Sequence, residues 1–223
     1  MEINPVGSYA NLSNGMDLHY LEFCSDIDQV ATVIFIHGSG PGASGWSNFK
    51  NNVDAFSQMG YSTIVIDIPG YGQTSKPTDA IYNLDFFTHY LDEFLVQKNI
   101  TQAILIGNSL GGAIAIGYAL DHPDKVSHLI LMATGGIEER EIYFATEGIQ
   151  AMVKYPMGSP EFTKEVLGEL LKLLVFDPKH VTQELIDERW QILQTQNAQV
   201  LASMQIPNLT DRLQELSIPI LGF

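Results

Sequence analysis

Hydrophobic and polar positions in the first 132 residues follow the pattern of buried strands alternating with amphipathic helices. Four apolar runs, each too continuous for a half-exposed strand, predict strands buried on both faces at 32–36, 61–66, 103–106 and 126–132. Apolar side chains at helical spacing predict helices over 49–59 and 84–96, and an Ala- and Gly-rich stretch after residue 109 predicts another. This alternation predicts a parallel sheet with right-handed crossovers, an α/β fold.

The chain begins differently. Residues 9–12 and 18–23 alternate between apolar and polar side chains on either side of Asn14 and Gly15. Asn-Gly between two such segments is a strong signal for a hairpin with a two-residue loop. We therefore expect an antiparallel pair of strands before the parallel ones.

After residue 133 the pattern becomes helical. From about 138 to 216 no strand-like run of useful length occurs, and prolines separate the helical segments. A stretch of this kind predicts a helical cap inserted into the sheet domain, with a separate C-terminal helical domain as the alternative. The apolar run at 218–222 favours the insertion, because it predicts a return to strand. The predicted division is a core over 1–134, a cap over 135–212, and a return to the core over 213–223.

Composition narrows the class of protein. The 223 residues include 26 acidic and 11 basic side chains, a formal charge of −15, which argues against nucleic acid or an anionic membrane as partner. Cys24 is the single cysteine, so an internal disulfide is impossible and a reducing cytosol fits best. The N-terminus has no signal-peptide pattern, and no apolar run approaches the length of a membrane span. We expect a soluble, cytoplasmic protein.

The main candidate for chemistry is Gly107-Asn108-Ser109-Leu110-Gly111, between a predicted strand and a predicted helix. This is the G-x-S-x-G pattern of a nucleophile elbow, a turn so tight that its serine takes strained backbone angles while flanking glycines avoid a clash. Ser109 at the end of a strand and the start of a helix is therefore a predicted nucleophile. The alternative is a Gly-rich turn in which Ser109 only caps the helix.

Three strand ends together resemble the α/β-hydrolase fold: a His37-Gly38 loop, the pattern Asp67-x-x-Gly70-x-Gly72-x-x-Ser75, and the elbow. A cap between the sixth and seventh strands fits that fold. The loop HGSGPGASGWSN at 37–48, combined with GNSLGG at 107–112, is similar to the meta-cleavage-product hydrolases. These serine enzymes cut a carbon–carbon bond in vinylogous 1,5-diketones during aromatic degradation. The resemblance covers essentially the whole chain, and the loop is more specific than the elbow.

The resemblance implies a set of site residues. Ser109 would be the nucleophile, and the N–H of Leu110 with that of Ser39, or alternatively of Gly40, would form the oxyanion hole. Such families often have glycine where Ser39 stands, which puts the local shape in doubt but not the backbone donor.

Four residues are implied as substrate contacts, and the first is Gly40 in the loop at 37–48. Asn48 and Asn108 would contact the enol or carboxylate end of the substrate, although Asn108 could equally buttress the elbow. Arg189 matches a family position where an arginine reaches down to the substrate carboxylate. From spacing alone, Arg189 would belong to an ordinary solvated helix face.

The base and acid of a serine triad have no candidate in the chain. In this fold they follow the strand after the cap, and none of the six histidines has that position. His37, at a strand end, is expected to be a hydrogen-bonded loop anchor. We expect the fold to be truncated before its last strands, with roughly 50–60 residues missing. The 223 residues alone are then expected to fold poorly, to expose an apolar edge at 218–221, and to be inactive.

The leading hypothesis is a carbon–carbon bond hydrolase (EC 3.7.1-like) acting on a 2-hydroxy-6-oxo-dienoate. Its rivals are a carboxylesterase of the same fold and a non-catalytic ligand-binding protein that has lost its triad. Dehalogenases and epoxide hydrolases are disfavoured because their elbow nucleophile is aspartate. The chain has no H-E-x-x-H motif, so no metal or other cofactor is implied beside the small-molecule substrate. The substrate's side group and the oligomeric state, including a homo-oligomer, stay open.

Overall fold

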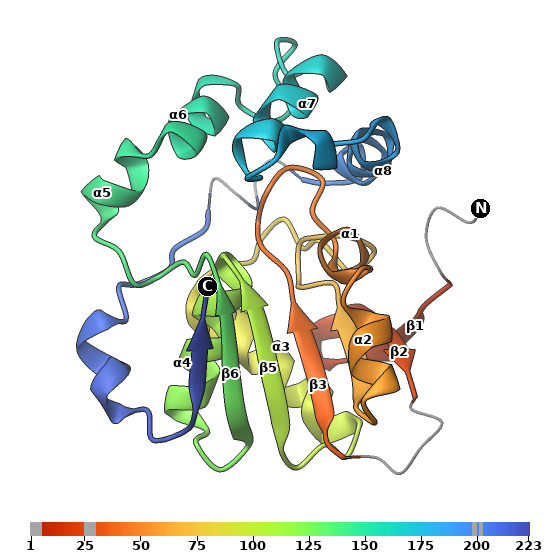
Figure 1. Cartoon of the computed structure of the whole chain (residues 1–223), viewed down its shortest axis with the longest axis vertical. Helices are drawn as coiled ribbons and strands as arrows, with labels where there is room; N and C mark the ends of the chain where they lie inside the picture. Colours follow the sequence, from red (N-terminus) through yellow and green to blue (C-terminus); the bar gives the residue numbers. More distant parts are fainter. Residues whose placement is uncertain (1–5, 25–29, 198–199, 201–202) are drawn as a thin grey trace.

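A computed structural model describes residues 6–24, 30–197, 200 and 203–223. In Figure 1 a twisted sheet stands between two layers of helices, and a group of helices lies above its upper edge. The strands are β1 (Ser8–Asn11), β2 (Asp17–Phe23), β3 (Thr32–Ile36), β4 (Ser62–Ile66), β5 (Ala103–Asn108), β6 (Val126–Met132) and β7 (Ile220–Gly222).

The described helices divide between the sheet domain and the group above it. Those beside the sheet are α1 (Gly45–Phe49), α2 (Val53–Gln58), α3 (Leu84–Gln97) and α4 (Leu110–Asp121). Those above it are α5 (Arg140–Ala145), α6 (Glu147–Lys154), α7 (Lys164–Leu173) and α8 (Gln183–Leu193). Short 3-10 segments are η1 (Ser13–Gly15), η2 (Pro178–His180) and η3 (Thr210–Glu215).

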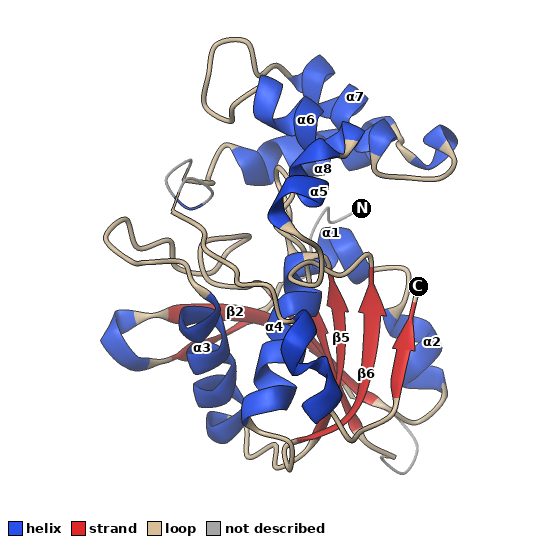
Figure 2. Ribbon diagram, turned by 90° about the vertical axis from the view of Figure 1, so that its left-hand side faces the viewer, coloured by secondary structure: helices blue, strands red, loops and turns tan. Residues whose placement is uncertain are grey.

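The sheet has the order β1-β2-β4-β3-β5-β6-β7. β1 pairs with β2, and β2 with β4, in antiparallel register, whereas every pair from β4 to β7 is parallel. Parallel neighbours require crossover helices, and these lie on both faces of the sheet (Figure 2). The predicted α/β fold with a mostly parallel sheet is confirmed.

Each face of the sheet packs against its own helices. One apolar cluster joins alternate residues of β3 and β4, such as Ile34 and Ile66, to α3 and α4. The other joins the intervening residues, such as Phe35, to Phe49 of α1 and Val53 of α2. Alternate side chains of a strand point to opposite faces, so burial on both faces explains why these runs are continuously apolar.

The sequence predictions were right about element type and less accurate about two boundaries. The predicted helix over 49–59 is wrong as a single element, because α1 ends at Phe49 and α2 begins at Val53. A capping box between Ser44 and Ser47 starts α1 inside the stretch that was predicted to be loop. The hairpin is present, but the Asn14-Gly15 turn belongs to a longer loop containing η1.

The helices α5 to α8, which we call the cap from here on, lie between β6 and β7 in the chain and above the carboxyl ends of the parallel strands (Figure 1). α7 and α8 share a separate apolar cluster that includes Leu167, Leu170 and Leu193. From Met204 to Ile218, apolar side chains instead pack against the main core. The domain boundaries at 134 and 212 stay a prediction.

β7 pairs in parallel with β6, so the predicted strand near the end of the chain is present. Within the part of the chain that the structure describes, β7 is an edge strand, and the side chains of Ile220 and Leu221 are about half exposed at 47% and 52%. The apolar edge expected from the sequence is therefore observed.

Helix α4 packs very closely against the sheet because its first turn lacks side chains where it crosses β3. A Cβ built on Gly111 would lie 1.9 Å from the carbonyl oxygen of Ile36, which is rigid backbone. Glycine at this position lets the helix begin directly beside the strand end.

Replacing Gly111 by alanine should therefore destabilise the protein by about 3 kcal/mol, the scale of severe overpacking. Gly148→Ala is the matched control, since a Cβ there meets only Leu174 at an ordinary 3.5 Å. Urea unfolding of both variants measures the difference. Equal stabilities of the two variants would contradict the close contact between α4 and β3.

Candidate active site

Ser109 lies at the turn between β5 and α4. Its backbone has φ 51° and ψ −114°, a conformation that L-residues rarely adopt. The Ser109 N–H donates to Met132 O at 2.9 Å, and its carbonyl oxygen accepts from the N–H groups of Gly112 and Gly135 at 2.9 and 3.0 Å. These hydrogen bonds to Met132, Gly112 and Gly135 hold Ser109 in its strained conformation, as expected for a nucleophile elbow.

The loop after β3 lies directly against this elbow. A Cβ built on Gly38 would be 3.0 Å from Ser109 Cβ and 3.3 Å from Asn108 O, so the next residue, Ser39, begins beside Ser109. Leu110 is the first residue of α4, and the first amides of a helix have no acceptor within it. The Leu110 N–H directly follows Ser109, and Gly38, the residue before Ser39, packs against it; the role of the Leu110 and Ser39 N–H groups as an oxyanion hole stays a prediction.

Asn48 and Asn108, both predicted as substrate contacts, are hydrogen-bonded to each other. Asn108 Nδ2 donates to Asn48 Oδ1 at 2.9 Å, and Asn48 Nδ2 donates to Ser44 O at 3.2 Å. This chain of bonds ties the end of β5 to α1 and supports the buttressing interpretation of Asn108. Contact of either amide with substrate stays a prediction.

His37 is a buried loop anchor, as the sequence predicts. Its Nδ1–H donates to Gly38 O at 2.7 Å, and its Nε2 accepts from the Ile68 N–H at 3.1 Å. Burial lowers the pKa of His37 to about 4, opposed by the negative charge of Asp67 and helped by the positive charge of Arg189. Because both ring nitrogens are engaged and the ring is neutral, His37 is unsuited to be the base for Ser109.

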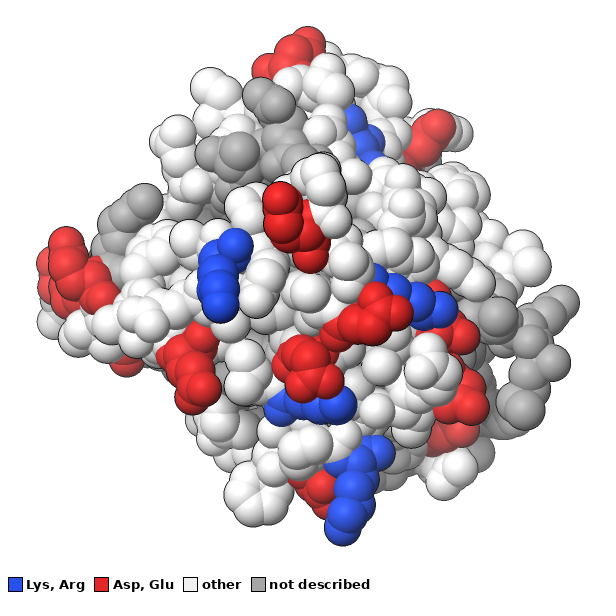
Figure 3. Space-filling model, turned by 90° about the horizontal axis from the view of Figure 1, so that it is seen from above, with Lys and Arg blue, Asp and Glu red and all other residues white. Residues whose placement is uncertain are grey.

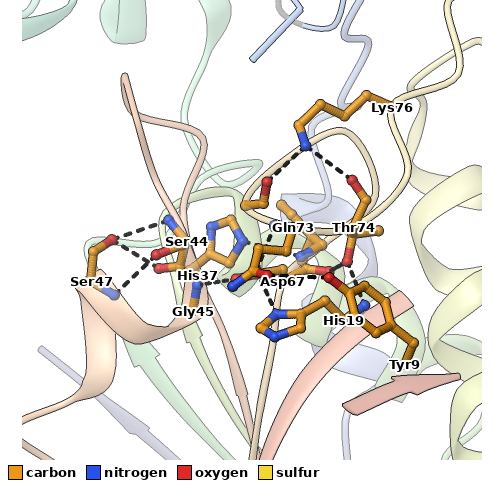
Figure 4. Close-up of polar contacts among 12 residues, drawn as sticks. Tyr9, His19, His37, Ser44, Gly45, Ser47, Asp67, Gln73, Thr74 and Lys76 are labelled. Atoms are coloured by element: carbon orange, nitrogen blue, oxygen red, sulfur yellow. Dashed lines mark hydrogen bonds and ion pairs between the residues drawn. The ribbon is translucent and has the colours of Figure 1, made fainter. Parts of the chain in front are cut away.

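Asp67, at the end of β4, is the hub of the polar contacts shown in Figure 4. Its carboxylate accepts from the N–H groups of Gly45 and Gln73 at 2.6 and 2.8 Å, and it pairs with His19 Nδ1 at 2.8 Å. Burial alone would raise the pKa of Asp67, but the hydrogen bond from His19 and the other contacts lower it overall. Asp67 thereby joins β2, the start of α1 and the turn after β4 beneath the candidate site.

Arg189 lies in α8 of the cap, close to the loop after β3. A Cβ built on Gly42 would be 2.0 Å from the Arg189 carbonyl oxygen, and Gly42 has φ +64°. Part of Arg189 is exposed, but its Nε is buried with no hydrogen-bond partner among the described residues. Burial lowers the pKa of Arg189 to about 10, which still leaves it positively charged at neutral pH. Helix α8 therefore places the backbone of Arg189 against the loop after β3, and the buried Nε of its side chain has no hydrogen-bond partner among the described residues.

Among the described residues, no histidine forms a hydrogen bond with the Ser109 hydroxyl. The two buried histidines, His19 and His37, are bound to Asp67 and to the loop backbone respectively. Gly40, the alternative oxyanion donor, is partly buried in the loop above β3, and nothing lies within 4 Å of a Cβ built on it.

Sequence reasoning missed three polar groups around the site. The Tyr71 hydroxyl is fully buried without a hydrogen-bond partner among the described residues, and its ring stands edge-on to His37 at 5.6 Å. Burial raises the pKa of Tyr71. Lys50 and Glu188 form an ion pair between α1 and α8. The sequence offered only weak signals for these: a tyrosine between two glycines, and a charge next to Arg189.

The comparison with known families agrees with this geometry. Residues 31–174 match the model of the alpha/beta hydrolase fold family. The chain belongs to that family. The matched region contains the loop after β3, the elbow and the first part of the cap, so the suspected family and the fold are confirmed.

Curated relatives of this α/β hydrolase carry the names of hydrolases of 2-hydroxy-6-oxo acids. A 2-hydroxy-6-oxononadienedioate/2-hydroxy-6-oxononatrienedioate hydrolase of Paraburkholderia phymatum is 38% identical, over 71% of this chain and 54% of its own length. One of the same name from Klebsiella pneumoniae is 31% identical, over 87% and 69%. The chain thus spans about half the length of the first curated relative it matches.

Solved structures give the same picture for this α/β hydrolase. The meta-cleavage product hydrolase CumD, in a mutant form, superposes with a TM-score of 0.73 at 25% identity, covering 97% of this chain and 90% of its own. An epoxide hydrolase, CorEH, reaches a TM-score of 0.72 at 18% identity over 97% of this chain and 81% of its own. The second likeness shows that the fold alone does not choose the reaction.

Two further observations concern the surface charges and the helices of this α/β hydrolase. Seen from above, Lys and Arg side chains lie scattered among acidic ones on the cap face (Figure 3). None of the helices that the structure describes has the length and apolar character needed to cross a bilayer.

The neutral, buried His37 should make stability depend on pH. The unfolded chain takes up this proton near pH 6.5, whereas the folded protein does so only near pH 4. The unfolded state therefore binds more protons between these values, and the free energy of unfolding should fall by up to about 3 kcal/mol as pH drops from 6.5 to 4.

Chemical unfolding at a series of pH values measures this slope. His37→Gln should be less stable at neutral pH. Between pH 6.5 and 4 its free energy of unfolding should depend less on pH, because the uptake of one proton by the unfolded chain is removed. His180→Gln, at an exposed position in the cap, should keep the slope of the unmodified protein. An unchanged slope in His37→Gln would show that His37 is not the titrating group.

Proposed function

We propose that the whole protein is a serine hydrolase that cleaves a carbon–carbon bond in a 2-hydroxy-6-oxo-dienoate, a meta-cleavage product of aromatic degradation. The observation that supports it most is the joint placement of a strained Ser109, a glycine-rich loop against it, and Arg189, whose backbone lies against that loop and whose Nε is buried without a hydrogen-bond partner among the described residues. The curated relatives carry names of the same reaction class.

In this mechanism the dienol form of the substrate first becomes a ketone. Ser109 then adds to the carbonyl carbon, and the oxygen that becomes negative is stabilised by the N–H groups of Leu110 and Ser39. Donors aimed in advance at such a charge contribute about 3–4 kcal/mol each. Cleavage of the carbon–carbon bond re-forms the carbonyl as an acyl ester of Ser109, and the other fragment leaves with the bonding electron pair as a dienolate conjugated to its 2-oxo acid group and takes up a proton. Water then hydrolyses the acyl ester, which gives a carboxylic acid and frees Ser109.

Arg189 gives the site its preference for an acidic substrate. A guanidinium binds a carboxylate through two parallel hydrogen bonds, and a buried guanidinium with an unsatisfied Nε favours such a partner strongly. Asn48 and Asn108, which are bonded to each other, hold the floor of the site between β5 and α1 and contact the enol end.

Proton transfer from Ser109 needs a general base, and the histidines described in the structure do not contact it. We therefore propose that the 223 residues by themselves lack dienoate turnover. Assays of the reaction accordingly use the whole protein, and the 223-residue chain serves as the comparison.

Ser109→Ala should lower kcat for a dienoate by at least about 10⁴-fold, the usual effect of removing a serine nucleophile. The measurement is the loss of dienoate absorbance, with a p-nitrophenyl ester assayed in parallel. A whole protein that hydrolyses only the ester is a carboxylesterase, and one that binds the dienoate without turnover is a binding protein. Full dienoate turnover by Ser109→Ala would exclude the proposed nucleophile.

Arg189→Met should raise KM for the dienoate about 10- to 100-fold, because it removes a charged hydrogen-bonding partner from the carboxylate. Hydrolysis of the uncharged ester should change less than about three-fold. Lys172→Met, in an exposed ion pair with Glu169, is the control within the cap. If both substrates lost activity equally, Arg189 would have a structural role instead.

A further inference from the structure

One ion pair connects the cap to the loop side of the sheet domain. Lys50 Nζ, immediately after α1, lies 2.5 Å from Glu188 Oε2 of α8, although 138 residues separate them in the chain. The Glu188 side chain is only 3% exposed and that of Lys50 is 31% exposed. By contrast, Lys164 and Asp187 pair at 2.6 Å within the cap with side chains 37% and 43% exposed.

This pair, whose carboxylate is buried, lies beside a second contact between the same two parts. The Gly42 N–H donates to Gln196 Oε1 at 3.0 Å, and Gly42 packs against the Arg189 carbonyl so closely that a Cβ would be excluded. The loop that follows Ser39 is therefore pressed against α8 at Arg189.

The Lys50–Glu188 ion pair affects Arg189 through the negative charge of Glu188. Glu188 is the residue next to Arg189, and its negative charge raises the pKa of the guanidinium, so the two groups interact. Glu188 Oε1 has no hydrogen-bond partner among the described residues, and neither has Arg189 Nε. A buried carboxylate without a counter-ion would draw in the nearest cation, because an unpaired buried charge is very costly.

We propose that Lys50 is a positioning residue, which occupies Glu188 so that the neighbouring Arg189 guanidinium stays free for a substrate carboxylate. The same ion pair holds α8 against the loop that carries Ser39. The proposal rests on the proposed role of Arg189, and it predicts that removing Lys50 alone is more harmful than removing Lys50 and Glu188 together.

The test is a set of variants in the whole protein. Lys50→Met should raise KM for the dienoate about ten-fold with kcat within about three-fold, because the released Glu188 competes for Arg189. Lys50→Arg should keep KM near that of the unmodified protein. The double variant Lys50→Met/Glu188→Gln should return KM to within about three-fold of the value for the unmodified protein, since no unpaired carboxylate remains.

Two controls separate positioning from a general loss of structure. The uncharged p-nitrophenyl ester should respond less than about two-fold to any of these variants, and Lys164→Met should leave both substrates unaffected. A double variant as impaired as Lys50→Met, or a KM in Lys50→Met unchanged within about two-fold, would overturn the proposal. If Lys50→Met fails to fold, Lys50→Arg and the double variant still decide it, because a double variant with KM raised about ten-fold would contradict it.

Hydrogen exchange distinguishes failure of this proposal from failure of the proposed function. Lys50→Met should speed amide exchange in residues 38–45 and in α8, whereas Lys164→Met should not. Faster exchange in a whole protein that does not turn over the dienoate would refute the proposed function and leave the contact between cap and loop intact. Unchanged exchange in Lys50→Met would refute that contact whatever the activity.

Discussion

The close approach of α4 to the end of β3 is the constraint on which the rest of the site depends. The first turn of the helix contains Gly111, which lies against the Ile36 carbonyl. The chain therefore passes from β5 into α4 through a tight turn, in which Ser109 takes strained backbone angles. The same approach places the loop after β3 beside the serine, because Gly38 fits against Ser109 Cβ. One packing requirement thus positions the candidate nucleophile, Ser109, and the candidate oxyanion donors together.

Two polar systems keep this arrangement rigid from below and from above. Below, the side chains of Asp67 and His37 accept hydrogen bonds from backbone N–H groups in the loops after β3 and β4. These loops frame the site, so the two buried polar side chains hold them in place. Above, α8 rests on the loop through Gly42 and through the ion pair of Lys50 with Glu188. The site therefore lies between a fixed floor and a cap that contributes charge.

The sequence was informative where one local pattern determines the structure. Continuous apolar runs such as 32–36 marked strands buried on both faces, and Ser109 between two glycines marked the elbow. It was less informative where tertiary contacts decide. Phe49 and Val53 have helical spacing, yet a break separates α1 from α2. The ion pair of Lys50 with Glu188 joins residues 138 apart, and no local pattern signals such a contact.

The most direct test of the account is a crystal structure of the whole protein, as its Ser109→Ala variant, with a dienoate bound. We expect the ketone oxygen to lie within hydrogen-bonding distance of the N–H groups of Leu110 and Ser39. We also expect the substrate carboxylate to be paired with Arg189. A dienoate bound with its carboxylate away from Arg189, or with its ketone away from residue 109, would contradict it.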